Sequence, residues 1–560
     1  METASLDRSI QILNAHKEQW ARLPVRAKWQ RLQGIIRRQV EVAERQVSAA
    51  ARAKSIPPGP LEAEEWAGGP YLVVRYSRLL MKSLQDIAAY GTPLVEDSAI
   101  RTRPDGQLVV RVFPTGIADR LLFAGFRGEV WMARGVTREN LAENMACFYR
   151  QKEPAPKMAL VLGAGNVAGI GPLDVLTKLY LDGSVCLLKL NPVNQYLGPF
   201  VEEVFGELIQ DGYVRVAYGG ADVGQYLCDH PGIDEIHITG SDATHDAIVF
   251  GAGEEGRERK RKGMPRLRKR ITSELGNVSP IIVVPGPWTA SQLKFQAENI
   301  ATQMVNNAGF NCAAARVLVL PEGWPIAGAL MDELRRTLAT APQRRAYYPG
   351  AEERYERFVS ANKTAQAIGS RQDGVLPWTI IRDLSPNDAT NICYTTECFC
   401  AVIAQTALPA SGPGDFLRHA VDFCNEKLWG TLNACILVHP ETEKELGAGL
   451  EDMIASLRYG TVGVNHWPVL GFGWGITTWG AFPGHTHENI QSGTGVVHNA
   501  LLFDRPERSV IYGPFHVVPK PAWFVTNRNA HKILPRLTRM QASPNLAKFV
   551  GVMSAAVTGL

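Results

Sequence analysis

The chain has 560 residues, enough for roughly three to four folding units, and 45% of them are apolar while 20% are charged. This composition excludes a disordered chain, and 9 cysteines are too few for a disulfide scaffold and fit a reducing compartment. Residues 1–20 mix charged and apolar side chains, so we expect no secretory leader. The longest stretch without a charged residue, Tyr459–His487, is too rich in glycine for a lipid-facing helix. We therefore expect a cytoplasmic globular protein.

The net charge of +4 conceals two basic segments. Residues 508–560 contain seven Lys or Arg and no acid, and Arg257–Arg270 contains nine Lys or Arg and one acid. A basic run can bind phosphate or nucleic acid. No aromatic residue interrupts Arg257–Arg270 and no nucleic-acid fold signature accompanies it, so we interpret it as a solvated surface insertion. A phosphate-binding or nucleic-acid-binding loop is the alternative.

The first elements are predicted to be helices followed by a hairpin. Apolar residues recur at helical spacing over residues 5–55 and again over 72–90, and Ser55–Pro60 breaks the pattern between them. Residues 106–134 alternate in short apolar groups, which predicts paired strands.

From residue 157 onward, strands alternate with helices. The predicted strands are Met158–Gly163, Val185–Leu190, Val214–Ala217 and Glu235–Thr239, and the predicted helices are Gly171–Leu181, Gly198–Gln210 and Val223–His230. A second region of the same kind starts at Ile281–Val284 and includes Ala314–Leu320, Ala401–Ala404 and Ala434–Val438. This alternation is typical of βαβ units, so the fold class is α/β with parallel sheets.

A glycine-rich turn follows the first of these strands. Gly163, Gly165 and Gly169 precede a helix, as in the Rossmann fingerprint, whose glycines let backbone N–H groups approach a pyrophosphate. Three residues instead of two separate Gly165 from Gly169, and the next strand ends in Lys189 instead of an acid. The turn alone leaves open a dinucleotide site and an ordinary strand-to-helix connection.

Three later segments contain the residue types of an active site. Glu274 lies in a Glu-Leu-Gly segment, Cys312 follows 38 residues later, and Glu397 follows after a further 85. Each also has a structural interpretation, since a single cysteine among small residues is most often simply buried.

In their order, these segments resemble the aldehyde dehydrogenase superfamily over roughly residues 10–515. The ordered motifs of that family are matched by Asn166, Lys189, Thr239-Gly240-Ser241, Glu274-Leu275-Gly276, Cys312 and Glu397-Cys398-Phe399. The resemblance implies a Rossmann-type cofactor domain, an α/β catalytic domain and a small oligomerisation hairpin. The implied boundaries are 1–273 for N-terminal helices and NAD(P)-binding domain (hairpin at about 105–135), 274–490 for the catalytic domain, 491–515 for an oligomerisation strand and 516–560 for a basic C-terminal extension.

The resemblance also implies roles for the matched residues. Cys312 would be the nucleophile that adds to an aldehyde, and Glu274 the base that hydrolyses the resulting thioester. The Asn166 amide and the Cys312 backbone N–H would stabilise the alkoxide. The cofactor-binding candidates are Lys189, Gly220, Gly240, Ser241, Glu397 and Phe399.

Some positions depart from the family pattern and indicate a divergent branch. The family's Pro-Trp-Asn-Phe-Pro segment is Ala-Gly-Asn-Val-Ala around Asn166. No acid stands three residues after Lys189, where an acid commonly favours NAD, so both NAD and NADP stay open as cofactors.

Three functions compete at this point. The first is oxidation of an aldehyde to its acid with NAD(P)+. The second is a CoA-linked acyl reductase or acylating dehydrogenase, against which Glu274 argues because such enzymes commonly lack that base. The third is a non-catalytic binding protein with the same fold.

Four aromatic residues lie where the family has its substrate entrance: Trp467, Phe472, Trp474 and Trp479. They predict an apolar tunnel for medium-chain, long-chain or aromatic aldehydes, with plain core packing as the alternative. The cysteines at 393–435 lack the usual zinc spacing, so no metal is predicted.

The predicted partners are a second copy of the chain and a membrane surface. Family members pair through a hairpin and a late strand, here within 105–135 and about 494–512, so we expect a homodimer or homotetramer. The C-terminal extension combines basic residues with Trp523 and Phe524, as segments that lie on anionic membranes do, whereas packing on a neighbouring subunit is the alternative.

Overall fold

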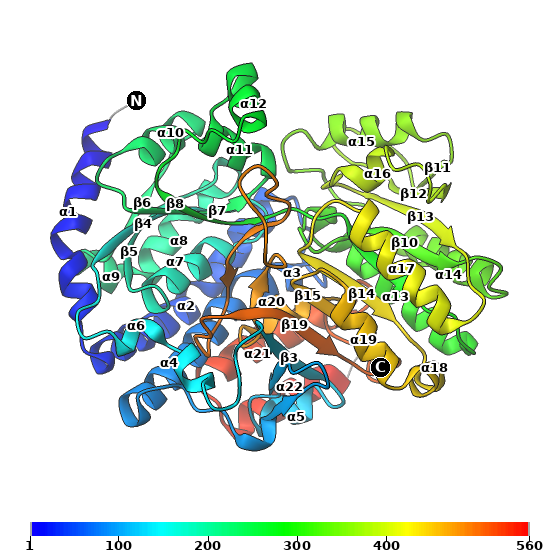
Figure 1. The fold of residues 1–560 in the computed structure, drawn as a ribbon, viewed down its shortest axis with the longest axis horizontal. Coiled ribbons are helices and arrows are strands. Elements are labelled where there is room, and N and C mark those ends of the chain that lie inside the picture. The colour runs from blue at the N-terminus through cyan, green and yellow to red at the C-terminus, as the bar shows by residue number, and fades with distance from the viewer. Residues whose placement is uncertain (1–2, 558–560) are drawn as a thin grey trace.

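The structure is a computed structural model that describes residues 3–557, and it is organised around two sheets (Figure 1). The six-stranded sheet has, in spatial order, β17 (Gly493–Thr494), β8 (Arg270–Leu275), β7 (Glu235–Gly240), β4 (Lys157–Leu162), β5 (Ser184–Lys189) and β6 (Val214–Ala217). All pairs in it are parallel except β17 with β8. The predicted α/β class is confirmed.

The second sheet has eleven strands. Their spatial order is β1 (Ile100–Thr102), β2 (Leu108–Phe113), β3 (Arg127–Met132), β19 (Pro506–Tyr512), β15 (Thr461–Val464), β14 (Asn433–Leu437), β9 (Ser279–Val283), β10 (Ala315–Pro321), β13 (Val402–Leu408), β12 (Trp378–Leu384) and β11 (Ala365–Ile368). A separate two-stranded ribbon joins β16 (Trp479–Gly480) to β18 (Val496–Val497).

Helices cover both sheets. In the first half of the chain they are α1 (Thr3–Arg22), α2 (Val25–Ala53), α3 (Glu62–Trp66), the π-helix η1 (Ala67–Tyr71), α4 (Leu72–Tyr90), η2 (Asp97–Ala99), α5 (Ile117–Leu122), η3 (Leu141–Asn144), α6 (Cys147–Arg150), α7 (Ile170–Tyr180), η4 (Pro192–Leu197), α8 (Gly198–Val204), α9 (Gly206–Gln210), α10 (Ala221–Asp229), α11 (Asp242–Phe250) and α12 (Gly253–Arg261). In the second half they are α13 (Ala290–Val305), η5 (Asn306–Gly309), α14 (Ala327–Thr340), α15 (Ala351–Ala361), α16 (Ile392–Thr395), α17 (Pro413–Lys427), α18 (Pro440–Leu446), α19 (Ala448–Ser456), α20 (Val469–Trp474), α21 (Ala530–Ala542) and α22 (Leu546–Val557).

The predicted alternation of strands and helices over residues 157–240 agrees with β4, β5, β6 and β7 and the helices between them. One predicted element differs, because the helix expected over Gly198–Gln210 is interrupted at Phe205 and forms α8 and α9. Every residue of β5 is buried, as expected for a parallel strand covered on both faces.

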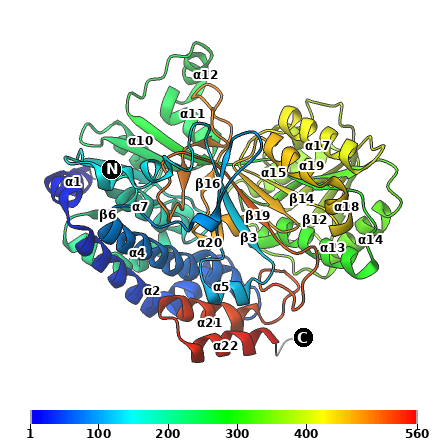
Figure 2. The ribbon, with the colours of Figure 1, turned by 60° about the horizontal axis from the view of Figure 1, so that its bottom comes forward.

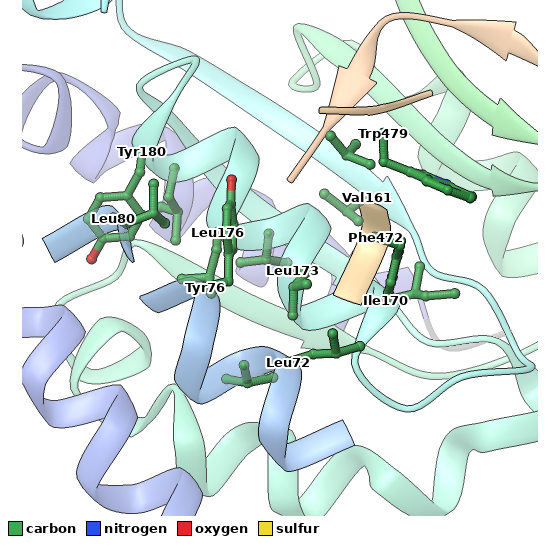
Figure 3. Packing of buried hydrophobic residues seen from close by; sticks show 14 of the residues in the cluster. Leu72, Tyr76, Leu80, Val161, Ile170, Leu173, Leu176, Tyr180, Phe472 and Trp479 are labelled. Atoms are coloured by element: carbon green, nitrogen blue, oxygen red, sulfur yellow. The ribbon is translucent and has the colours of Figure 1, made fainter. Parts of the chain in front are cut away.

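Helix α7 is enclosed on all sides, since each of its eleven residues is buried. It packs between the small sheet and α4, and Figure 3 shows the side chains that meet there: Leu72, Tyr76 and Leu80 from α4 with Leu173, Leu176 and Tyr180 from α7. This packing supports the glycine-rich turn that precedes α7.

The hairpin strands extend the large sheet of the same chain. β3 pairs antiparallel with β19, and β19 pairs parallel with β15. The edges of this sheet are β1 and β11, with three and four residues. The hairpin is thus joined to the sheet within one chain, and the homodimer or homotetramer stays a prediction.

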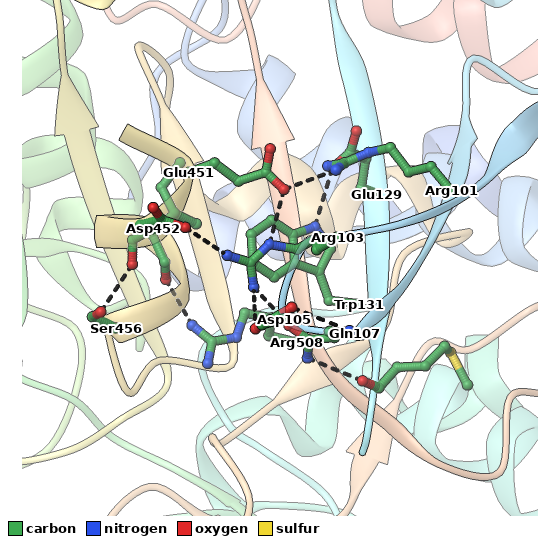
Figure 4. A network of polar contacts seen from close by, with 12 residues as sticks. Arg101, Arg103, Asp105, Gln107, Glu129, Trp131, Glu451, Asp452, Ser456 and Arg508 are labelled. Atoms are coloured by element: carbon green, nitrogen blue, oxygen red, sulfur yellow. Dashed lines mark hydrogen bonds and ion pairs between the residues drawn. The ribbon is translucent and has the colours of Figure 1, made fainter. Parts of the chain in front are cut away.

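A polar network connects the hairpin to helix α19 (Figure 4). The Arg103 side chain is 2% exposed and donates to Glu451 at 2.9 Å and to Asp452 at 3.2 Å, both on α19. Its guanidinium also lies 4.6 Å from the Trp131 ring centroid. Arg101 bridges Glu129 and the same Glu451 at 2.9 and 2.8 Å.

The two basic segments have different environments. The first forms α12 and the loop after it, where ion pairs such as Arg257–Glu254 and Lys260–Asp246, each 2.6 Å long, offset much of the charge at the surface. This agrees with a solvated insertion. The second contains α21, which packs on α2, α3 and α4 of the same chain, and α22, which packs on α21 (Figure 2). Among residues 3–557, no helix combines the length and apolarity needed to cross a bilayer.

We expect Arg103→Ala to lower the free energy of unfolding by about 3 kcal/mol, because it removes a buried charge from three carboxylates and from the Trp131 ring. Arg134→Ala, an exposed position at the end of the same hairpin, is the control and should change it by less than about 0.5 kcal/mol. Urea unfolding measures both, and equal stability of the two variants would contradict the role of the network.

Candidate active site

The central contact of the site joins Cys312 and Glu274. The Cys312 Sγ lies 3.3 Å from the Glu274 Oε1. Glu274 is 2% exposed near the end of β8, and burial raises its pKa to about 7. Cys312 follows η5 and is half-buried, and burial together with the Glu274 charge raises the pKa of its thiol well above the usual value. The carboxyl group thus titrates near neutrality beside the thiol.

Trp479 holds the carboxyl group from the other side. Its Nε1 donates to the Glu274 Oε1 at 2.8 Å, which lowers the pKa that burial has raised. Trp479 is 1% exposed and does not line the apolar chamber described below. Its indole contacts the Glu274 carboxyl group, and a part for Trp479 in the substrate wall stays a prediction.

Asn166 lies beside the segment that carries the thiol. Its side-chain amide donates to the Phe310 carbonyl at 2.9 Å, two residues before Cys312. Its backbone carbonyl accepts from the Lys54 Nζ at 3.0 Å, the Asn307 Nδ2 at 3.0 Å and the Tyr347 hydroxyl at 3.1 Å. The amide is therefore fixed within reach of the reacting region.

Four of the predicted cofactor residues meet at one edge of the small sheet, where its parallel strands have their carboxyl ends. Lys189 ends β5 and Gly240 ends β7, while Gly220 precedes α10 directly after β6. Ser241 caps α11 by accepting a hydrogen bond from the Thr244 N–H at 3.2 Å. In open α/β sheets this edge is where ligands bind.

At this edge, the Lys189 ammonium group can still donate hydrogen bonds. Lys189 is 7% exposed, and burial lowers the pKa of its ammonium group. This ammonium group has no hydrogen-bond or ion-pair partner within residues 3–557. An ammonium group in this position can donate to hydroxyl groups of a ligand.

Glu397 and Phe399 approach from the large sheet. The Glu397 Oε1 is buried without a hydrogen-bond partner among the described residues, and burial raises the pKa of this carboxyl to about 8. The other oxygen lies so close to Gly276 that a Cβ there would meet it at 2.0 Å, so a side chain at that position would displace the Glu397 carboxyl group. Phe399 is a non-glycine residue with a positive φ of 41°, and its ring lies 5.0 Å from the Tyr348 ring.

An apolar chamber of about 320 Å³ lies beside the Asn166 loop and the segment before Cys312, since Val167, Asn307 and Asn311 line it. Trp467, Phe472 and Trp474 line it, so three of the four predicted aromatic residues come together there. The Trp467 Nε1 also donates to the Ala313 carbonyl at 2.6 Å, which ties the chamber wall to the residue after Cys312. Its volume is within the range of small-molecule sites.

Residues 179–349 match the family model described as the aldehyde dehydrogenase family. Among curated proteins, the N-succinylglutamate 5-semialdehyde dehydrogenase of Sphingopyxis alaskensis is 27% identical over 176 residues, 31% of this chain and 33% of its own. The chain thus spans about a third of the length of the first curated relatives it matches.

Solved structures extend the likeness to almost the whole chain. An aldehyde dehydrogenase of Pseudomonas syringae, solved with NAD+ and octanal, has a TM-score of 0.59 at 15% identity, and the match covers 92% of this chain and 90% of that one. The NADP-dependent glyceraldehyde-3-phosphate dehydrogenase of Bacillus halodurans, solved with NADP, has a TM-score of 0.60 at 17% identity and 91% coverage of both. Residues 179–349 are thus similar to the aldehyde dehydrogenase family, and the fold of almost the whole chain is similar to that of solved aldehyde dehydrogenases at low identity.

The loop around Asn166 lacks the bulky flanking residues of the aldehyde dehydrogenase pattern and is held by other contacts. The Asn194 side chain donates to the Ala164 carbonyl at 2.8 Å on one side, and the Gly169 N–H donates to the Gly68 carbonyl at 2.8 Å on the other. Gly68 belongs to η1, so a π-helical turn supports the loop.

Two features of the site were not found from the sequence. The first is a buried ion pair between Lys54 and Glu65, 2.8 Å long, beside Asn166. Neither residue lies in a recognisable motif, because their pairing depends on how α2 and α3 pack. The second is the C-terminal extension, which lines the chamber instead of leaving the body of the protein. Among the described residues, no group of three or more His, Cys, Asp or Glu is placed to hold a metal ion.

We expect Glu274→Gln to speed the alkylation of Cys312 by iodoacetamide at pH 8, because the Glu274 charge is, after burial, a cause of the raised pKa of the thiol and the variant removes it. Mass spectrometry of the Cys312 peptide measures the rate. The partly exposed Cys147, whose alkylation should not change, is the internal control. A slower reaction of Cys312 in the variant would contradict this electrostatic coupling.

Proposed function

We propose that the chain oxidises an aldehyde to its carboxylic acid with NAD+ or NADP+ as hydride acceptor. The observation that carries the proposal is the 3.3 Å contact between the Cys312 thiol and the Glu274 carboxyl group. A free aldehyde is a poor hydride donor, and a nucleophile that adds to its carbonyl removes that obstacle. The likeness of residues 179–349 to the aldehyde dehydrogenase family and the similar fold both support this chemistry.

Each of these residues has a separate role in the proposed reaction. The Cys312 sulfur adds to the carbonyl carbon as its S–H bond breaks, and the thiol proton is released to solvent. The Asn166 amide and the Cys312 backbone N–H stabilise the alkoxide in a site sheltered from water. The dinucleotide, when bound, accepts the hydride. Glu274 then takes a proton from the water that attacks the thioester, and the acid leaves with Cys312 restored as a thiol.

The residues at the sheet edge fit a dinucleotide. The unpaired Lys189 ammonium can donate to the hydroxyls of one ribose, and the unpaired Glu397 oxygen can accept from those of the other. At the same edge the chain has small residues, Gly220, Gly240 and Ser241, so a bound ligand could come close to the backbone there. The related solved structures hold NAD+ or NADP.

Water is favoured over CoA as the acceptor of the acyl group. Glu274 contacts the thiol directly, so a base stands where the attacking water must lose its proton. The apolar chamber supports an apolar aldehyde, of medium or long chain or aromatic, as the substrate. We further propose that the enzyme is cytoplasmic and works as a homodimer or homotetramer.

We propose that the membrane contact of the C-terminal extension is made by α22 and not by α21. The apolar residues of α21, including Ile533, Leu534 and Leu537, are buried against the same chain. On α22, by contrast, Leu546 is 78% and Val550 57% exposed. No acid occurs after residue 507, so an anionic membrane is the partner that matches this surface in charge.

An aldehyde panel assayed with NAD and NADP should give reduced cofactor in the absence of CoA. Cys312→Ala should abolish turnover, and Glu274→Gln should give one reduced cofactor per site followed by a stall at the thioester. Stopped-flow absorbance measures the burst. Glu254→Gln, an exposed acid on α12, is the control for charge removal and should behave as wild type. Retained turnover in Cys312→Ala contradicts the mechanism, and turnover that requires CoA favours the acylating alternative.

Turnover limited by thioester hydrolysis should fall about tenfold per pH unit below a pKa of about 7, because Glu274 acts only when ionised. Trp479→Phe removes a donor that lowers this pKa, so the acidic limb should move to higher pH. Trp324→Phe, which packs on Trp288 away from the site, is the control. A limb that stays in place in Trp479→Phe would show that the indole does not act on Glu274.

Sedimentation with vesicles tests the membrane contact. Vesicles of phosphatidylserine and phosphatidylcholine should bind wild type, and the double change Leu546→Asp, Val550→Asp should weaken binding at least about tenfold. Met264→Asp, which alters an apolar side chain 59% exposed elsewhere, is the control. Equal binding of all three proteins, or none by wild type, rules the contact out.

A further inference from the structure

The apolar chamber beside Cys312 has a wall that comes from the end of the chain. Its lining includes residues of α4, the loop after β4 and the Trp467–Trp474 segment, and it is completed by residues of the segment Val517–Leu537. From that segment the lining side chains are Val517, Pro519, Lys520, Pro521, Ala522, Trp523, Phe524, Val525, Asn527, Ala530, Ile533, Leu534 and Leu537. The sequence resemblance to known aldehyde dehydrogenases stops before this segment.

The chamber has a polar end and an apolar end. The polar end is formed by Lys54, Glu65 and Asn307, and the Lys54 Nζ bonds both the Asn166 carbonyl at 3.0 Å and the Asn307 Oδ1 at 3.1 Å. This end therefore lies next to the Asn166 loop and to Asn311, the residue before Cys312, although Asn166, Glu274 and Cys312 do not themselves line the chamber. The residues that α21 contributes are all apolar, and among them Ile533 and Leu537 are 6% and 8% exposed. A molecule with a carbonyl group at one end and an apolar chain at the other matches this arrangement.

The wall is fixed to the body of the protein. The Val525 N–H donates to the Thr302 Oγ1 at 3.0 Å, and the Thr526 hydroxyl donates to Glu298 at 2.6 Å, both on α13. Lys520 pairs with the same Glu298 at 2.5 Å. The Trp523 ring lies 5.9 Å from the Phe126 ring, so aromatic contact joins the segment to the hairpin region. Because these contacts hold the segment, the wall has a fixed position and limits the length of the chamber.

We propose that the segment Val517–Leu537 is the specificity-determining wall of the substrate site, which closes the chamber around the unbranched apolar chain of a long aliphatic aldehyde. The proposal rests on the proposed aldehyde oxidation and adds the part of the chain that selects the substrate. Each methylene that the wall shields from water should raise kcat/KM about fourfold. Catalytic efficiency should therefore climb from propanal to decanal.

Substitutions at Leu537 test the wall because its side chain faces the chamber from the middle of α21. Leu537→Trp fills the chamber, so the ratio of kcat/KM for decanal to that for propanal should fall at least tenfold. Leu537→Ala should shift the longest accepted aldehyde to greater length. Arg536→Trp adds the same side chain on the exposed face of the same helix and should leave the ratio at the wild-type value. Thermal unfolding confirms that each variant is folded.

A binding measurement separates this inference from the proposed reaction. Calorimetric titration of decanal into Cys312→Ala, and into the same protein with Leu537→Trp, should show at least tenfold weaker binding in the second. If wild type turns over no aldehyde but this difference is found, the reaction proposal fails and the chamber inference stands. If the ratio is the same in wild type, Leu537→Trp and Arg536→Trp, or if decanal does not bind, the inference is overturned.

Discussion

The contact between Glu274 and Cys312 depends on keeping a carboxyl group out of water, and much of the surrounding structure serves that condition. One oxygen of Glu274 receives the Trp479 indole N–H and the other has no partner within residues 3–557. Burial of a carboxyl group with so few donors favours the protonated form, which explains the raised pKa. The backbone must therefore hold the group in place, and β8 does so between β7 and β17.

The thiol side of the contact is held by strained backbone. In η5 the non-glycine residues Asn307 and Ala308 have φ values of 52° and 57°, each in the left-handed region. Such conformations cost about 1–3 kcal/mol each and persist where neighbours enforce them. Asn307 is enforced by hydrogen bonds from Lys54, from the Tyr347 hydroxyl and from its own amide to Asn166. The ion pair of Lys54 with Glu65 is thus linked through Asn307 to the segment that carries Cys312.

The sequence predicted the strands of the small sheet well because strands covered on both faces contain uninterrupted apolar residues, as β5 does. It also predicted the proximity of Asn166, Glu274 and Cys312, although only through the order of the motifs. It did not predict the polar role of Trp479, since an indole N–H matters only once its partner is known. Amphipathic spacing in α21 indicates that one face is buried but does not identify what covers it, which is why the chamber wall was missed.

The connection between β3 and β19 has a consequence for how the protein is made. The pairing joins Arg127–Met132 to Pro506–Tyr512, so the hairpin is synthesised long before its partner strand exists. Likewise α21 covers α3 and α4, which leave the ribosome hundreds of residues earlier. Contacts of such sequence separation close late, and until then the edge of β3 and the apolar side of α4 are open to other chains. During translation, then, the first ninety residues and the hairpin are the parts that a chaperone has most reason to hold.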